Sequence, residues 1–419
     1  MTMAWAEAAD RATADPSCVP ELYAFLEQDE ALLGDRMDPP WKSARPLAKW
    51  MCLAAQLRAA QSAAEVQALE AGHEDVMQSI GAIPYVPLLV AQWADAMSDK
   101  GRLVSPTYAT RWLEGVYESL APYRGLSSVH APLLYQYLLA KDEKSAALVQ
   151  RTDLGATDFA RVGRYLDILA YLYYAGLVYT LQQAYEKAED VWQTCIALPS
   201  ESVSHIQLDA FKKLILVRLL AGHNVEGEAL LKHTSVNVRS QYLRQAGAYL
   251  ALAHNYRRMR SGSRDLHTLL AAHAEQFAAD ANTGLVQQCV AAQPQRLVEA
   301  LARIYSTLPL DAVAAYLACT PDEARSALAS TPRVDVSYAN GPQVGAFPLP
   351  DGVACTLAER DSAPYVALAL RPAPTPMLPA EHDGRAALAA LVRAAHLAPS
   401  HLAKLAALHG APRGDAQTS

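Results

Sequence analysis

Histidines and cysteines are the residues of this chain that could support metal binding or nucleophilic chemistry. His267 and His273 stand six positions apart, so on one helix they face different sides and make a poor metal pair. His205 could act as a ligand or a base, but it opens an apolar stretch, where we expect a packed histidine with a backbone partner. The cysteines show no C-x-x-C spacing, and we expect Cys195 to be a core residue rather than a reactive thiol.

Short catalytic motifs do not occur in the sequence. It contains no phosphate-binding G-x-x-x-x-G-K-[ST] loop, no G-x-G-x-x-G, no H-E-x-x-H and no G-x-S-x-G. We therefore predict no catalytic residue, no cofactor site and no metal site, and a protein that is not an enzyme. A hydrolase whose catalytic residues come together from distant positions remains the alternative.

Two further groups of residues have competing interpretations. A basic cluster could contact nucleic acid or an acidic partner, but Gly262 and two serines interrupt it, which favours a solvated loop. A tyrosine stripe could line a ligand groove, but core packing of a helical repeat explains it more simply. The cluster consists of Arg257, Arg258, Arg260 and Arg264, and the stripe of Tyr165, Tyr171, Tyr173, Tyr174 and Tyr179.

Composition narrows the class of protein. Of the 419 residues, 52% are hydrophobic and 19% are charged, so the chain can bury a large core. The net charge of −7 disfavours nucleic-acid binding by the chain as a whole. The most apolar run, 165–181, contains Asp167 and is short for a bilayer span, so we expect no membrane association. The first residues lack a secretory pattern and the cysteines are scattered, which predicts a location in the cytoplasm and nucleus.

The N-terminal part, 1–163, predicts helical repeats, because apolar residues recur at helical spacing between proline and glycine breaks. The expected helices are 47–57, 63–80, 88–97, 108–120 and 133–139. Residues 164–305 predict further repeats. Within 165–198, Gly176, Tyr179, Ala188, Trp192 and Cys195 match the tetratricopeptide spacing of small and large residues, so we expect one degenerate repeat. Helices should follow at 203–217, 238–256, 265–280, 284–291 and 295–305.

Residues 306–350 predict a winged helix. A short helix at 310–317 precedes a Thr320-Pro321-Asp322-Glu323 capping box, which opens a second helix at 321–329. Alternation at 333–338, an Asn340-Gly341 turn and a return at 343–347 predict a hairpin. The second helix carries Asp322, Glu323 and a single Arg325, a charge pattern that disfavours DNA binding.

Beyond this unit we expect a Pro/Ala-rich linker or insertion at 351–382, C-terminal helices at 383–409 and a disordered tail at 410–419. The fold class is thus an all-α tetratricopeptide-like solenoid, then a winged-helix subdomain with a small β-hairpin, then C-terminal helices. The candidate subunit interface consists of the hairpin and the C-terminal apolar stripe. Its residues are Val334, Val336, Tyr338, Leu388, Leu391, Val392, Leu402, Leu405 and Leu408.

This order of elements resembles the PCI family, whose members build the proteasome lid, a translation-initiation complex and the COP-9 signalosome. The segments VSHIQLDAFKKLILV, at 203–217, and FAADANTGLV, at 277–286, look like those of a signalosome member. The resemblance covers about 165–350, weakens over the first 160 residues, and departs from the pattern at 351–380.

The resemblance implies a non-catalytic scaffold that supports removal of a ubiquitin-like modifier from cullins, and so regulates cullin-RING ubiquitin ligases. The catalytic zinc site of that complex, with its His-x-His pair, lies on another subunit, and this chain has no His-x-His. Expected partners are other signalosome subunits, reached through winged-helix edge pairing and a C-terminal helical bundle. The alternatives are a proteasome-lid or initiation-complex subunit and, in another class, a nucleic-acid-binding winged-helix adaptor.

Overall fold

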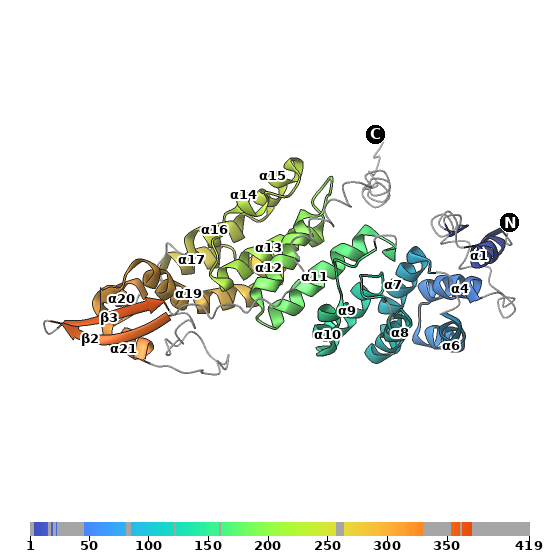
Figure 1. Ribbon diagram of the computed structural model, residues 1–419, viewed down its shortest axis with the longest axis horizontal. Coiled ribbons are helices and arrows are strands. Elements are labelled where there is room, and N and C mark those ends of the chain that lie inside the picture. The colour runs from blue at the N-terminus through green and yellow to red at the C-terminus, as the bar shows by residue number, and fades with distance from the viewer. Residues whose placement is uncertain are drawn as a thin grey trace, which may run out of the picture. The chain divides into compact units, whose positions relative to one another are not determined.

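The computed structural model describes residues 4–15, 18–19, 22, 46–80, 85–120, 123–158, 161–256, 264–317, 319–329, 353–360 and 363–370. In these ranges the chain is mostly helical, as expected, with a small antiparallel sheet (Figure 1). It forms two compact units, one with the described residues up to Ala184 and one starting at Tyr185. The boundary therefore falls between the two helices of the predicted 165–198 repeat, rather than at residue 163.

The first unit is a succession of helices in which sequence neighbours pack together. α7 contacts α4, α5 and α8, and α9 contacts both α8 and α11. The bounds are α1 (Ala4–Ala14), α4 (Pro46–Ala59), α5 (Ala63–Ala68), α6 (Glu70–Ser79), α7 (Pro87–Val104), α8 (Pro106–Ser119), α9 (His130–Ala140), α10 (Lys144–Arg151) and α11 (Tyr165–Leu181). Of the helices in the described ranges, none has both the length and the apolar content that a membrane crossing needs.

The turn between α7 and α8 shows how the sequence sets these boundaries. Ser105 ends α7 and caps α8, where its Oγ accepts the Tyr108 N–H at 3.0 Å. Pro106 occupies the first helical position, where its missing N–H costs no hydrogen bond. We expected this helix to end at residue 97, but α7 runs on through Gly101 to Val104. A Cβ at Gly101 would lie 3.0 Å from the Ala109 Cβ, so the glycine permits close contact between α7 and α8.

The second unit is built around α13. This helix contacts α12, α15, α16 and α19, and six of its apolar side chains are fully buried, as its all-round apolar pattern predicts. The six are Ala210, Phe211, Leu214, Ile215, Leu216 and Val217. The helices are α12 (Tyr185–Ala197), α13 (His205–Ala221), α14 (Gly227–Leu230), α15 (Val236–Gln245), α16 (Gly247–Tyr256), α17 (Arg264–Ala272), α18 (Ala274–Ala279) and α19 (Thr283–Ile304).

Helix α19 corrects the expectation of two separate helices at 284–291 and 295–305. It is continuous through Pro294, which cannot donate a hydrogen bond to the preceding turn. Side chains tie this turn to α16. Gln293 Nε2 donates to the Tyr256 carbonyl at 2.8 Å, and the Tyr256 hydroxyl donates to the Cys289 carbonyl at 2.7 Å. These buried contacts hold the turn in place and offset the missing backbone bond.

The last described elements form a small sheet with two helices. They follow the order β1 (Thr307–Pro309), α20 (Leu310–Leu317), α21 (Pro321–Ala329), β2 (Val353–Arg360) and β3 (Ala363–Leu370). The strands are antiparallel in the order β1-β3-β2, with Leu308 opposite Val366 and Leu357 also opposite Val366. The capping box forms as predicted, since the Thr320 N–H donates to Glu323 Oε2 at 2.8 Å and Thr320 Oγ1 accepts the Glu323 N–H at 3.3 Å.

The observed hairpin lies in 353–370, inside the range that we expected to be a linker. Proline and alanine content suggested a linker, but short apolar runs such as VACTLAER cannot be assigned by periodicity alone. The hairpin predicted at 333–347 falls outside the described residues. So do all the candidate interface residues: Val334, Val336, Tyr338, Leu388, Leu391, Val392, Leu402, Leu405 and Leu408.

Candidate functional site

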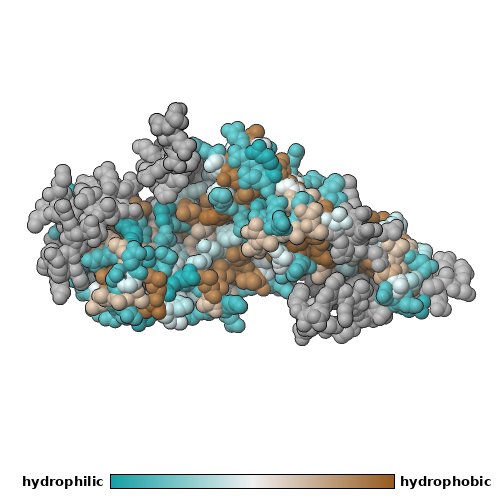
Figure 2. All heavy atoms as spheres, turned by 180° about the vertical axis from the view of Figure 1, so that it is seen from behind, coloured by the Kyte–Doolittle hydropathy of each residue, from teal (hydrophilic) through white to brown (hydrophobic). Residues whose placement is uncertain are grey.

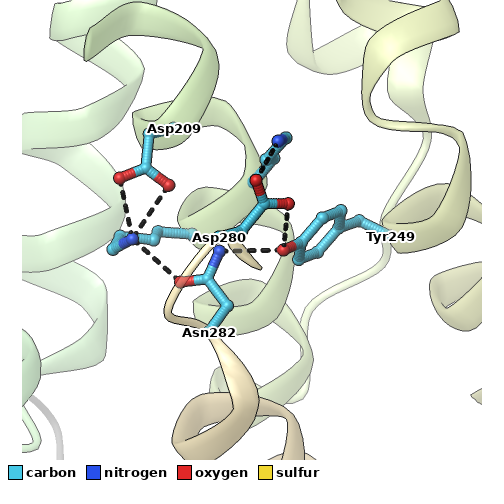
Figure 3. Close-up of polar contacts among 6 residues, drawn as sticks. Asp209, Tyr249, Asp280 and Asn282 are labelled. Carbon is cyan, nitrogen blue, oxygen red and sulfur yellow. Dashed lines mark hydrogen bonds and ion pairs between the residues drawn. The ribbon is translucent and has the colours of Figure 1, made fainter. Parts of the chain in front are cut away.

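The two segments that carry the family resemblance, 203–217 and 277–286, meet in a buried polar network. Lys213 of α13 joins Asp209 to Asn282, two of the residues labelled in Figure 3. Its ammonium donates to both Asp209 carboxylate oxygens at 2.9 Å and to the Asn282 side-chain oxygen at 2.8 Å. The Lys213 side chain is only 7% exposed, and these three oxygens take the place of water around its charge.

A second part of the network involves the neighbouring lysine. Lys212 Nζ lies 2.7 Å from Asp280 Oδ1, while the Tyr249 hydroxyl donates to Asp280 Oδ2 at 2.8 Å. Asn282 Nδ2 donates to the same hydroxyl at 2.9 Å. Tyr249 thereby links the Lys212–Asp280 pair to Asn282, and so to Lys213. Burial raises the pKa of Tyr249, with a smaller opposing effect from Asn282, so its phenol stays protonated and can keep donating.

The loop between α18 and α19 positions Asp280 and Asn282. Ala281 adopts a left-handed backbone, with φ of +53°, and the Asn282 N–H donates back to the Phe277 carbonyl at 2.9 Å. Phe277 in turn packs edge-on against Tyr249, with ring centroids 5.1 Å apart. This helix end therefore fixes the direction in which both polar side chains enter the network.

The start of α13 is held by a capping box. Ser204 Oγ accepts the Gln207 N–H at 3.1 Å, and the Gln207 side chain reaches back to the Ser204 N–H at 3.4 Å. The buried Gln207 amide also donates to the carbonyls of Cys195 and Leu198 at the end of α12. The segment thus joins α12, α13 and the α18–α19 loop.

The chemistry of this arrangement is structural. Each buried charge has an opposite charge or an amide beside it, which leaves no group poised to exchange protons with a substrate. The two segments quoted from the sequence contain Asp209, Asp280 and Asn282, but Tyr249 lies outside both. The four-residue spacing from Asp209 to Lys213 could have indicated the first ion pair.

The predictions for individual histidines and cysteines agree with the structure only in part. The expectation of a packed His205 is wrong: it is exposed, because the first position of α13 faces solvent once Ser204 caps the helix. Cys195 is fully buried, as expected, and burial raises its pKa, as it does for Cys289. Burial also raises the pKa of Cys52 to about 12.

The remaining candidates are placed only in part. The His267 side chain and residues 257–263, with three arginines of the basic cluster, lie outside the described residues. His273 packs edge-on against Phe277, with ring centroids 6.2 Å apart. Within the described ranges, no three histidine, cysteine or acidic side chains come together in a group that could hold a metal ion.

The comparisons with known proteins match this part of the chain. A family model for the N-terminal helical repeats of COP9 signalosome complex subunit 3 matches residues 118–238, which include the start of the network. This chain is similar to COP9 signalosome complex subunit 3 over part of its length. The resemblance expected from the segment at 203–217 is thereby confirmed.

Two proteins named COP9 signalosome complex subunit 3 show how far the similarity reaches. The chain is 32% identical to the one from Drosophila melanogaster over 147 residues, 35% of this chain and 32% of that protein. It is 29% identical to the one from Arabidopsis thaliana over 220 residues, 52% of this chain and 48% of that protein. The matched part of the chain thus spans between a third and a half of these relatives.

Proposed function

We propose that this chain is a non-catalytic scaffold subunit of a COP9 signalosome. The observation that carries the proposal is its similarity to subunit 3 of that complex, since the matched range 118–238 includes the segment 203–217, which supplies Lys213 to the polar network. The network ties helices together and offers no reacting group, as a scaffold requires. The described surface also has large apolar residues open to solvent, among them Leu181 at 76%, Val236 at 74% and Ile304 at 72% exposure.

The apolar surface fits a protein that works in an assembly. On the face drawn in Figure 2, apolar residues gather in several separate patches between hydrophilic ones. Exposed apolar area is stabilised when a partner removes it from water. A subunit that is surrounded by others would use several such contacts.

We further propose that residues from β1 to β3 form a winged helix of the PCI type. Support comes from the order strand, helix, helix, hairpin and from the antiparallel sheet β1-β3-β2. β2 lies at the edge of this sheet, and an edge strand is a template for a strand of a neighbouring subunit. Edge pairing and the C-terminal segment around Leu388 and Leu402 are the proposed contacts with other signalosome subunits.

In this proposal the chain supports the removal of a ubiquitin-like modifier from cullins and so regulates cullin-RING ligases. Its role is to position other subunits, one of which carries the zinc isopeptidase site. The sequence has no His-x-His pair that could supply such a site itself. The proposed location is the cytoplasm and nucleus.

Affinity purification of the tagged full chain from its own cells, followed by mass spectrometry, tests the assembly. We expect the other signalosome subunits to be recovered in amounts comparable to the tagged chain. A Ser204→Ala variant with a weakened cap should still recover them if it folds. Recovery of proteasome-lid or initiation-complex subunits in their place would overturn the assignment.

The non-catalytic role has a separate test. Metal analysis of the purified chain should find no stoichiometric zinc, and the chain alone should not cleave a modified cullin. One zinc per chain together with isopeptidase activity would contradict this part of the proposal.

A further inference from the structure

A groove in the first unit lies where α7, α9 and α11 come together. It has a volume of about 230 Å³, and its polar and aromatic walls are formed by Asp95, Asp99, Arg102, Tyr135, Asp167 and Tyr174. The polar network of α13 has no part in it. Three elements that are separate in sequence therefore contribute carboxylates, a guanidinium and two phenol rings to one concave surface.

The two arginines of the groove contact other side chains that line it. Arg164 bonds Asp167 Oδ1 at 2.7 Å and also pairs with Asp95. Arg102 lies over the Tyr135 ring, 5.9 Å from its centroid, and donates to its hydroxyl at 3.4 Å. The Arg164 guanidinium is thus held between two carboxylates, whereas Arg102 is exposed and keeps donors free.

Two carboxylates keep acceptor capacity. Asp99 is exposed, and within the described part of the chain its carboxylate makes no hydrogen bond or ion pair. The Asp167 side chain is only 4% exposed, and its Oδ2 has no hydrogen-bond partner among the described residues. Burial raises the pKa of Asp167 even though Arg164 opposes the shift, so an added positive charge would relieve a real cost.

The aromatic side of the groove offers an apolar surface beside these carboxylates. Tyr135 and Tyr174 stack with ring centroids 5.5 Å apart at an angle of 29°, and both are half-buried. Leu166, 44% exposed, also lines the groove. A ring face next to a carboxylate suits a side chain with an apolar stem and a cationic end.

We propose that this groove binds a lysine or arginine side chain carried by an extended segment of a partner protein. The cation bonds Asp99, and the stem packs on Tyr174 and Leu166. The choice of a basic segment rests on charge complementarity: three aspartates and two arginines line the groove, which gives it a net negative charge, and Asp99 has no cationic partner among the described residues. The tyrosine stripe of the sequence thus divides, with Tyr171 in the core and Tyr174 on a binding surface.

The test uses the full chain and two fluorescein-labelled peptides. One carries lysines between leucines on a glycine–serine frame, and the other has glutamate in place of each lysine. Fluorescence anisotropy at low salt should show that the chain prefers the lysine peptide, with affinity that falls as salt rises. Asp99→Lys should weaken binding of that peptide by about fivefold or more and strengthen binding of the glutamate peptide. Glu74→Lys makes the same charge change at an exposed position of α6, so it is the matched control and should leave the preference intact.

The exchange of preference by Asp99→Lys is the decisive result, because a general change in net charge would affect the Glu74→Lys protein equally. Circular dichroism should show that both variants fold. Equal binding of the two peptides to the unchanged chain, no binding of either, or equal behaviour of the two variants would each overturn the proposal.

Discussion

At the scale of single residues, Tyr249 has the clearest measurable role. Its hydroxyl donates to Asp280 and accepts from Asn282, and the whole residue is buried. Tyr249→Phe leaves Asp280 and Asn282 in place but removes the hydroxyl that hydrogen-bonds to both of them. We expect a loss of about 1–3 kcal/mol in the free energy of unfolding, because buried polar groups then lack a partner.

Urea denaturation of the full chain checks this prediction. Tyr316→Phe removes a hydroxyl from a residue that is 44% exposed and should change stability by less than about 0.5 kcal/mol. If the two variants lost similar stability, the network would not contribute as we describe.

His73 and His130 predict how the first unit responds to acid. Burial lowers the pKa of each from 6.5 to about 4. Below about pH 6.5 the unfolded chain takes up protons that the folded chain refuses, so stability is complete above that pH and is lost as pH falls toward 4. At pH 5 the loss should be about 2 kcal/mol for each histidine.

Hydrogen exchange can measure this loss of stability. Peptides from α6 to α9 are compared at pH 7 and pH 5, with correction for intrinsic exchange rates. His73 lies between Trp93 and Trp112, so His73→Phe should fit and should remove about half of the pH dependence. An unchanged dependence in that variant would show that other groups cause it.

At the scale of elements, the end of α13 gives a prediction about the backbone. Gly222 has φ of +78°, and the His223 N–H donates back to the Arg218 carbonyl at 2.8 Å. Gly222→Ala should destabilise the second unit by about 1–2 kcal/mol, because a left-handed backbone strains an L-residue. The added Cβ would also lie 3.1 Å from Arg296 Nη1.

Gly247→Ala is the matched control. Gly247 starts α16, its φ is not positive, and a Cβ there has no neighbour within 4 Å. This change should be neutral or slightly stabilising. Thermal melting of both variants distinguishes them, and equal melting temperatures would contradict the role that we assign to the α13 end.

The elements also show what the sequence could and could not predict. Helix 205–221 was recognisable because its long apolar pattern matches its burial on all sides. The continuity of α19 was not, because Pro294 breaks a helix locally, and contacts with distant elements, among them those of Gln293 and Tyr256, support it there. The hairpin of β2 and β3 was missed because each strand pairs with a segment that its own sequence does not reveal.

The sequence indicated most residues of the network around Lys213 but not that they contact one another. The segments 203–217 and 277–286 were recognised by their residue sequences, yet about 60 residues separate them. No local sequence pattern predicts that Asn282 contacts Lys213. The groove at Asp99 was not foreseen either, since α7, α9 and α11 contribute to it from three separate stretches.

At the scale of the whole molecule, the segment after Pro379 is the proposed anchor in the assembly. Its apolar stripe includes Leu388, Leu391 and Leu402. Burying several leucine-sized side chains against partners at about 1.5–3 kcal/mol each would give strong attachment before ordering costs are subtracted. Truncation after Pro379 should therefore remove the chain from the complex and leave its own melting temperature unchanged.

Co-purification and thermal melting of the truncated chain check both parts of this prediction. If the stripe instead folds onto the chain's own helices, truncation should lower the melting temperature by several degrees. That result would contradict the anchor. A truncated chain that still enters the complex would contradict it as well.

Alkylation of the buried cysteines can report separately on the opening of each of the two units. Cys52 belongs to the first unit and Cys195 and Cys289 to the second, and burial both hides each thiol and suppresses its thiolate. A brief pulse of an alkylating reagent can then modify these sites only in molecules whose unit has opened. Peptide mass spectrometry would time the opening of each unit in a single tube of unaltered protein, in a cell lysate as readily as in purified form.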